Sequence, residues 1–142
     1  MKEFAMAQAL PASTPDTAVP GAVTQAEGAA MLRAAFTLFR LWGMDDSQAR
    51  VLLGQPSPST FYRWKRGDVG TLPCDLLWRL GDLMGIHKAL RYLFMEPERA
   101  YAWVSKPNAA FNGQSALSRM LAGAPSDLTA VRNYLDAERG GW

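Results

Sequence analysis

The sequence has few of the residues that build disulfides, metal sites and catalytic centres. Its 142 residues include one cysteine, Cys74, and one histidine, His87. A single cysteine cannot form an internal disulfide, and one cysteine with one histidine cannot supply the four nitrogen and sulfur ligands of a structural zinc site. These absences exclude a disulfide scaffold and a zinc finger, and we expect the protein to use neither a metal ion nor a cofactor.

Long apolar runs are also absent. No stretch approaches the roughly 18 uninterrupted apolar residues that a membrane-spanning helix needs. The first six residues carry Lys2 and Glu3 and no sustained apolar segment, so they do not resemble a secretory signal. We therefore expect a soluble, cytoplasmic protein with no membrane partner.

Charged residues are sparse and unevenly distributed. Only 20% of the residues are charged, against 49% that are hydrophobic, so a chain of this length can bury one sizeable core. The formal net charge is +2, but residues 31–71 hold six basic and three acidic residues, and three of the six are Arg63, Lys65 and Arg66. A local basic cluster is what contacts to nucleic-acid phosphates require, although the exposed end of a helix would look similar.

The alternating pattern of strands is missing as well, and helical periodicity dominates the chain. Residues 1–23 are rich in Ala, Pro, Ser, Thr and Gly without any period, which predicts a flexible tail. Apolar spacing and capping residues predict an all-α fold with helices over residues 24–42, 46–53, 58–66, 73–94, 98–105, 115–122 and 126–139. Because glycines interrupt the longest of these segments, we expect a bend or break near Gly85.

Capping residues predict where the first three helices begin. Thr24 and Glu27 have the spacing of a capping box, and either Asp45 or Asp46 can cap the second helix. Ser57 is a favourable N-cap for the third helix, because a proline follows it at the first helical position.

The second and third helices, joined by a short turn, have the layout of a helix-turn-helix, in which the second helix enters the DNA major groove. Phe61 and Trp64 are three residues apart and are expected to face the core. The other side chains form a candidate operator DNA-binding surface, which consists of Ser59, Thr60, Tyr62, Arg63, Lys65 and Arg66. The pattern also fits a short exposed helix with a basic end and, less well, a surface for stacking single-stranded nucleic acid.

Enzyme chemistry has little support in the sequence. His87 lies on an apolar-periodic helix, where a histidine at the edge of the core is expected more often than a general base. Cys74 begins a helix but has no evident base, so we interpret it as a buried or inert cysteine. Asp75 and Asp82 form a carboxylate pair of the kind that any helix surface shows, and glycine motifs that cradle phosphates are absent. We expect no catalytic residues and no enzymatic activity.

The last residue of the sequence is the large apolar Trp142. Chain ends usually fray, and they rarely carry such a side chain unless it docks somewhere. We expect Trp142 either to fold back on its own core or to anchor in a pocket of a partner protein.

The C-terminal half resembles the toxin-binding domain of Xre/MbcA/ParS-type antitoxins. The resemblance rests on LRYLF at 90–94, PERAYAW at 97–103, KPN at 106–108, FNGQSAL at 111–117, MLAG at 120–123 and VRNYL at 131–135, continuing to Trp142. It extends over residues 30–142, with an Xre-like helix-turn-helix region first. The run Trp-x-x-x-Pro-Asn followed by Phe-x-Gly-x-Ser is specific for the family, whereas Ala116 replaces a proline that relatives often have.

The resemblance implies a function. Members of this family neutralise a RES-domain toxin that degrades NAD or transfers ADP-ribose from it, and they dimerise and often repress their own operon. By this resemblance, the toxin-binding residues are Pro107, Asn108, Phe111, Gly113 and Ser115 in a loop, and Arg139, Gly140, Gly141 and Trp142 in a tail. We expect a homodimer within a toxin–antitoxin hetero-oligomer, with operator DNA as a second partner.

These observations predict three parts: a flexible tail over 1–23, a helix-turn-helix region over 24–72, and a toxin-binding and dimerisation domain over 73–142. One alternative is a plain transcriptional regulator whose C-terminal region only dimerises. Another is a toxin-binding protein whose helix-turn-helix has lost DNA binding.

Overall fold

The computed structural model describes residues 24–140, so the predicted flexible tail over 1–23 lies outside the described residues. This part of the chain contains helices and no strand, which confirms the all-α prediction. The helices are α1 (Gln25–Leu41), α2 (Asp46–Leu52), α3 (Pro58–Lys65), α4 (Cys74–Leu93), α5 (Pro97–Trp103), the 3₁₀ helix η2 (Ala109–Phe111), α6 (Ala116–Met120) and α7 (Pro125–Glu138). None of the helices in residues 24–140 is both long enough and apolar enough to span a bilayer.

Local capping interactions begin the first helices where the sequence predicts. The backbone N–H of Glu27 donates to the Thr24 hydroxyl, and the Thr24 N–H donates to the Glu27 carboxylate at 2.9 Å. In α2 the cap is Asp45 rather than Asp46, and Gln48 completes a second capping box. Each box satisfies N–H groups that a helix N-terminus would otherwise leave without partners.

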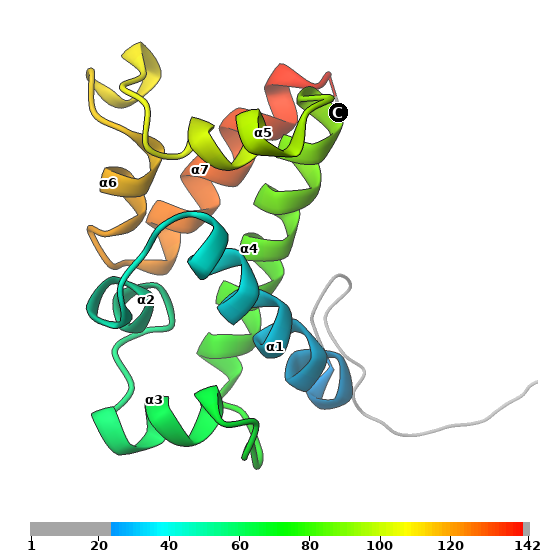
Figure 1. The fold of residues 1–142 in the computed structure, drawn as a ribbon, viewed down its shortest axis with the longest axis vertical. Coiled ribbons are helices and arrows are strands. Elements are labelled where there is room, and N and C mark those ends of the chain that lie inside the picture. The colour runs from blue at the N-terminus through cyan, green and yellow to red at the C-terminus, as the bar shows by residue number, and fades with distance from the viewer. Residues whose placement is uncertain (1–23, 141–142) are drawn as a thin grey trace, which may run out of the picture.

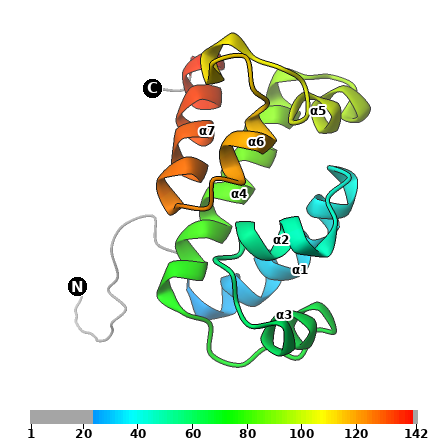
Figure 2. The ribbon, with the colours of Figure 1, turned by 90° about the vertical axis from the view of Figure 1, so that its left-hand side faces the viewer.

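The long helix α4 is the axis of the molecule. It packs against α1 on one side and α7 on another, as Figures 1 and 2 show. Leu80, Leu83 and Ile86 of α4 are fully buried, and they belong to a single apolar cluster that includes residues from α1 through α7. The helix-turn-helix region and the C-terminal helices therefore share one core.

Of the bend or break expected near Gly85, the break is wrong, because α4 runs unbroken from Cys74 to Leu93. Gly85 makes room for a side chain of the neighbouring helix, since a Cβ atom at this position would come too close to the guanidinium of Arg132. That guanidinium donates from Nη1 to the carbonyl oxygen of Gly81 at 3.2 Å. The contact offsets the roughly 1 kcal/mol that each glycine costs a helix.

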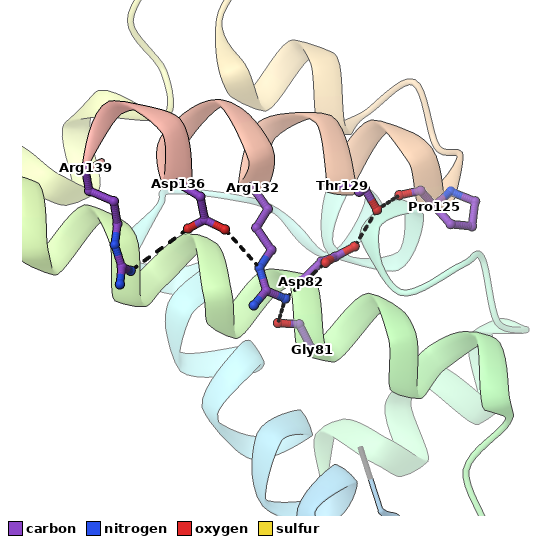
Figure 3. A network of polar contacts seen from close by, with 7 residues as sticks. All are labelled: Gly81, Asp82, Pro125, Thr129, Arg132, Asp136 and Arg139. Carbon is purple, nitrogen blue, oxygen red and sulfur yellow. Dashed lines mark hydrogen bonds and ion pairs between the residues drawn. The ribbon is translucent and has the colours of Figure 1, made fainter. Parts of the chain in front are cut away.

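Arg132 is part of a polar network between α4 and α7 (Figure 3). Its Nη1 atom lies 3.2 Å from Oδ1 of Asp82, and its Nε atom lies 3.7 Å from Oδ2 of Asp136. The Thr129 hydroxyl donates to Oδ2 of Asp82 at 2.7 Å. The polar contacts between the two helices therefore converge on Gly81 and Asp82, at one level of α4.

A second arginine, Arg79 of α4, is buried, with 6% of its side chain exposed. Its Nε atom donates to the Asp75 carboxylate at 2.9 Å, and its Nη2 atom donates to the Gly123 carbonyl at 3.0 Å. A longer contact of 3.4 Å joins Nη1 to the carbonyl of Leu52, the last residue of α2. One guanidinium thus connects α4, the end of α2 and the loop between α6 and α7.

We predict that Arg79→Met lowers the free energy of unfolding by about 2–4 kcal/mol, because two backbone carbonyls lose their donors in a buried site. Urea unfolding followed by circular dichroism measures the change. Arg40→Met, at an exposed position of α1, is the matched control and should change stability by no more than about 0.5 kcal/mol. Equal stability of the two variants would contradict the role assigned to Arg79.

Candidate functional site

The helix α3 is anchored by one face and open on the other. Phe61 and Trp64 are buried, as the sequence predicts. The Phe61 ring packs edge-on against Phe36 of α1, with 5.5 Å between ring centroids. Ser57 caps the helix by accepting a hydrogen bond from the Thr60 N–H, and Pro58 is the first helical residue. The anchored face fixes the direction in which the remaining side chains point.

The predicted DNA-binding side chains differ in how accessible they are. Ser59, Lys65 and Arg66 are exposed, and Tyr62 has 45% of its surface exposed. Arg63 and Thr60 are half-buried, and the Thr60 hydroxyl accepts a hydrogen bond from Ser57. The structure therefore places five of the six candidates on α3 and Arg66 at its C-cap, with Thr60 occupied in the N-terminal cap.

An acidic residue of α2 contacts this surface. The Asp46 carboxylate accepts a hydrogen bond from the Tyr62 hydroxyl at 3.2 Å and one from Nζ of Lys65 at 2.8 Å. The hydrogen bond from Lys65 holds the pKa of Asp46 below its usual value. The sequence indicates Asp46 only as a candidate cap, because residues 46 and 65 show no local spacing that would indicate a pair.

The predicted toxin-binding loop closes on Asn108. The side-chain oxygen of Asn108 accepts from the Ala110 N–H, and its carbonyl oxygen accepts from the N–H groups of Phe111 and Gly113. Its own N–H donates to Gln114 across the loop. Gly113 has a φ of +81°, a conformation that suits glycine. These bonds, together with the short helix η2 that they enclose, give the loop a defined shape.

An aromatic cluster holds the loop on the body of the protein. Phe111 is buried, and its ring centroid lies 5.3 Å from that of Tyr134 in α7. Trp103 of α5 stacks on the same tyrosine at 6.2 Å. Of the five loop candidates, Phe111 is thus an anchor, and Pro107 and Gly113 are exposed. Asn108 and Ser115 are half-buried; Ser115 caps α6.

The tail candidates follow the end of α7. The Arg139 guanidinium lies over the Tyr92 ring of α4, with 5.1 Å to the ring centroid, and 4.0 Å from the Asp136 carboxylate. Gly140 is exposed. Gly141 and Trp142 lie outside the described residues. The structure therefore places the start of this tail beside the C-terminal end of α4 (Figure 1).

The side chains considered as candidates for catalysis include Asp75, Asp82 and Cys74. Asp75 pairs with Arg79 and Asp82 with Arg132, so the two carboxylates have separate partners. Of the two alternatives for Cys74, buried or inert, the first is wrong: the residue is exposed at the first position of α4. Within residues 24–140, no group of His, Cys, Asp and Glu side chains could hold a metal ion.

Comparisons with known proteins find two families. Residues 21–85 match the antitoxin Xre-like helix-turn-helix domain, and residues 89–141 match the antitoxin Xre/MbcA/ParS C-terminal toxin-binding domain. The two matches meet inside α4, whereas the division predicted from the sequence falls after residue 72 and stays a prediction.

One relative is the uncharacterized protein y4oB of Sinorhizobium fredii (strain NBRC 101917 / NGR234). It is 46% identical over 112 residues, which cover 79% of this chain and 86% of the relative. No solved structure gives a significant match.

His87, the single histidine, is half-buried and stacks on Tyr101 with 6.3 Å between ring centroids. Burial, aided by the charge of Arg91, lowers the pKa of His87 below its ordinary value of 6.5. The folded protein therefore binds this proton less readily than the unfolded chain does. The stability that neutral His87 contributes is present above pH 6.5 and decreases as the pH falls through that value towards the folded-state pKa.

We predict that acidification from about pH 7.5 to about pH 5.5 lowers the urea midpoint of the wild-type protein, and that His87→Gln removes most of this dependence. The measurement is equilibrium unfolding of both proteins at each pH. An equal loss of stability in the variant would assign the dependence to other groups.

Proposed function

The chain belongs to the Xre/MbcA/ParS-type antitoxin family, and from this membership we propose that it binds a RES-domain toxin, blocks its active site and represses its own operon. Family membership itself implies an antitoxin with a helix-turn-helix DNA-binding domain and a toxin-binding domain. The identity of the toxin, the blocking of its active site and the contact residues are parts of the proposal.

The observation that carries the toxin-binding proposal is the match of residues 89–141 to the toxin-binding domain. This stretch contains the loop that closes on Asn108 and the helix α7 that leads to Arg139. The loop is held by Phe111 and therefore needs little ordering when a partner binds, which lowers the entropic cost of association. Pro107, Gly113 and the tail from Arg139 to Trp142 are the positions that we assign to toxin contact.

We predict that the chain co-purifies with a RES-domain protein encoded in the adjacent reading frame and inhibits its consumption of NAD. Deleting Gly140–Trp142 should weaken inhibition by about 30-fold or more, since truncation of a tryptophan anchor typically costs 2 kcal/mol or more. Titration of toxin activity with each antitoxin measures the loss.

Arg63→Ala combined with Arg66→Ala is the control for this experiment and should inhibit the toxin like the wild type. Undiminished inhibition by the truncated chain would remove the tail from the mechanism. A plain regulator with a C-terminal dimerisation module would purify without the neighbouring protein.

The DNA-binding proposal rests on α3. Its basic side chains, Arg63, Lys65 and Arg66, lie at the end of a helix whose other face is buried, so they can reach phosphates while Ser59 and Tyr62 approach base edges. Helix-turn-helix proteins place two recognition helices about 34 Å apart on DNA when they dimerise. We therefore include a homodimer in the proposal.

We predict that Arg63→Ala with Arg66→Ala weakens binding to a duplex taken from upstream of the protein's own reading frame. The dependence of log K on log salt should become shallower by about 1.8, because each lost phosphate contact contributes about 0.9. Fluorescence anisotropy over a range of salt concentrations measures both quantities. An unchanged affinity and slope would favour a toxin-binding protein whose helix-turn-helix no longer binds DNA.

A further inference from the structure

Asp46 lies between the second and third helices and contacts the candidate DNA-binding surface of α3. It is the first residue of α2, the helix that in a helix-turn-helix crosses the DNA backbone. Two carboxylates lie at the start of this helix: Asp45 accepts from the Gln48 N–H, and Asp46 faces α3.

The contacts of Asp46 are those that a phosphate would make. Its two carboxylate oxygens accept separate hydrogen bonds, Oδ1 from the Lys65 ammonium at 2.8 Å and Oδ2 from the Tyr62 hydroxyl at 3.2 Å. Two of the six candidate DNA-contacting side chains are therefore occupied by a group of the same chemistry as their expected ligand. The Asp46 carboxylate is charged at neutral pH, and the hydrogen bond from Lys65 holds its pKa below the ordinary value of 3.8.

The Asp46–Lys65 pair is exposed enough to exchange partners. The side chains of Lys65 and Asp46 have 46% and 43% of their surface exposed. Exposed ion pairs of this kind contribute only about 0–1 kcal/mol, so a phosphate can replace the carboxylate at small cost. Once displaced, Asp46 would remain near the bound phosphate as a repelling charge.

A groove of about 350 Å³ beside Asp46 contains further charge. It lies between α1, α2 and α3, and its lining includes Arg40 and Lys65 as cations and Asp46 as an anion. Removing the single anion of this lining would leave two cations. The charge balance of this groove therefore depends on Asp46.

We propose that Asp46 is an intramolecular competitor of DNA phosphates, which holds Lys65 and Tyr62 in the free protein and limits the affinity of α3 for any duplex. This inference rests on the proposed DNA binding and assigns a regulatory residue to that surface. Competition by Asp46 makes DNA binding by the isolated antitoxin weaker than its basic residues alone would allow.

The test compares Asp46→Asn with the wild type on two duplexes, one from upstream of the protein's own reading frame and one of unrelated sequence. The variant should bind both about 3–10-fold more tightly near 0.1 M salt, as expected for the removal of one nearby repelling charge. The salt slope should steepen by about 0.9, since one more phosphate charge is neutralised. Fluorescence anisotropy gives both values.

Glu98→Gln is the matched control, because it makes the same change in net charge on an exposed residue of α5, at the end of the molecule away from α3 (Figures 1 and 2). Its affinity and slope should equal those of the wild type. Asp46→Ala is measured beside Asp46→Asn, because one of the two substitutions could disturb the start of α2. Thermal unfolding reports whether each variant is folded.

A double variant tests whether Asp46 affects DNA affinity through Lys65. In a Lys65→Gln background, Asp46→Asn should lose at least half of its gain in affinity on a logarithmic scale, because the cation that Asp46 restrains is gone. A merely structural role of Asp46 would not move the salt slope and would not depend on Lys65.

The outcomes separate this inference from the proposed function. If the wild type binds DNA and both Asp46 variants bind equally or more weakly, Asp46 is not a competitor and the inference is overturned, while DNA binding stands. A gain that is unaffected by Lys65→Gln also overturns it. If neither the wild type nor the variants bind any duplex at low salt, the inference and the DNA-binding part of the proposed function both fail.

Discussion

The hydrogen bonds of the buried Arg79 guanidinium determine how the two ends of the molecule are placed relative to one another. It reaches the carbonyl of Leu52 at the end of α2 and the carbonyl of Gly123 ahead of α7, from a helix that packs on both α1 and α7. Helix C-termini carry partial negative charge, so a cation is favourable at the end of α2. A buried charge held in this way is costly to move, and it fixes α2 against the loop between α6 and α7.

This connection makes the helix-turn-helix and the loop that we propose for toxin binding parts of one body. Figures 1 and 2 show α3 at one end of α4, with α5, the loop around η2 and the end of α7 at the other. Val51 of α2 lies beside Gly123, so α2 approaches the loop between α6 and α7 at this point as well. The surfaces that we assign to DNA and toxin are therefore separated along one shared helix.

Local interactions of this fold could be predicted from the sequence, and interactions between distant residues could not. The capping box of Thr24 and Glu27 and the inward face of Phe61 and Trp64 depend on residues three apart, which periodicity reveals. The expected break at Gly85 failed because the reason for that glycine, Arg132, lies on another helix.

In the candidate site, too, local features could be predicted from the sequence and contacts between distant residues could not. The positions on α3 follow from helical spacing, and the family follows from the motifs between Trp103 and Ser115, but the contact of Asp46 with Lys65 joins two helices. The anchoring role of Phe111 depends on Tyr134, which is 23 positions away in the chain and shows no spacing signal. Which of the exposed residues touch DNA or toxin stays a prediction from the sequence.

One helical body carries the two proposed partner surfaces at its opposite ends, so both partners should bind at once. Size-exclusion chromatography with light scattering, on a mixture of antitoxin, RES-domain toxin and operator duplex, tests it most directly. The account predicts a single complex whose mass includes all three components. Release of the DNA when toxin is added, with antitoxin–toxin and free duplex eluting apart, would contradict it.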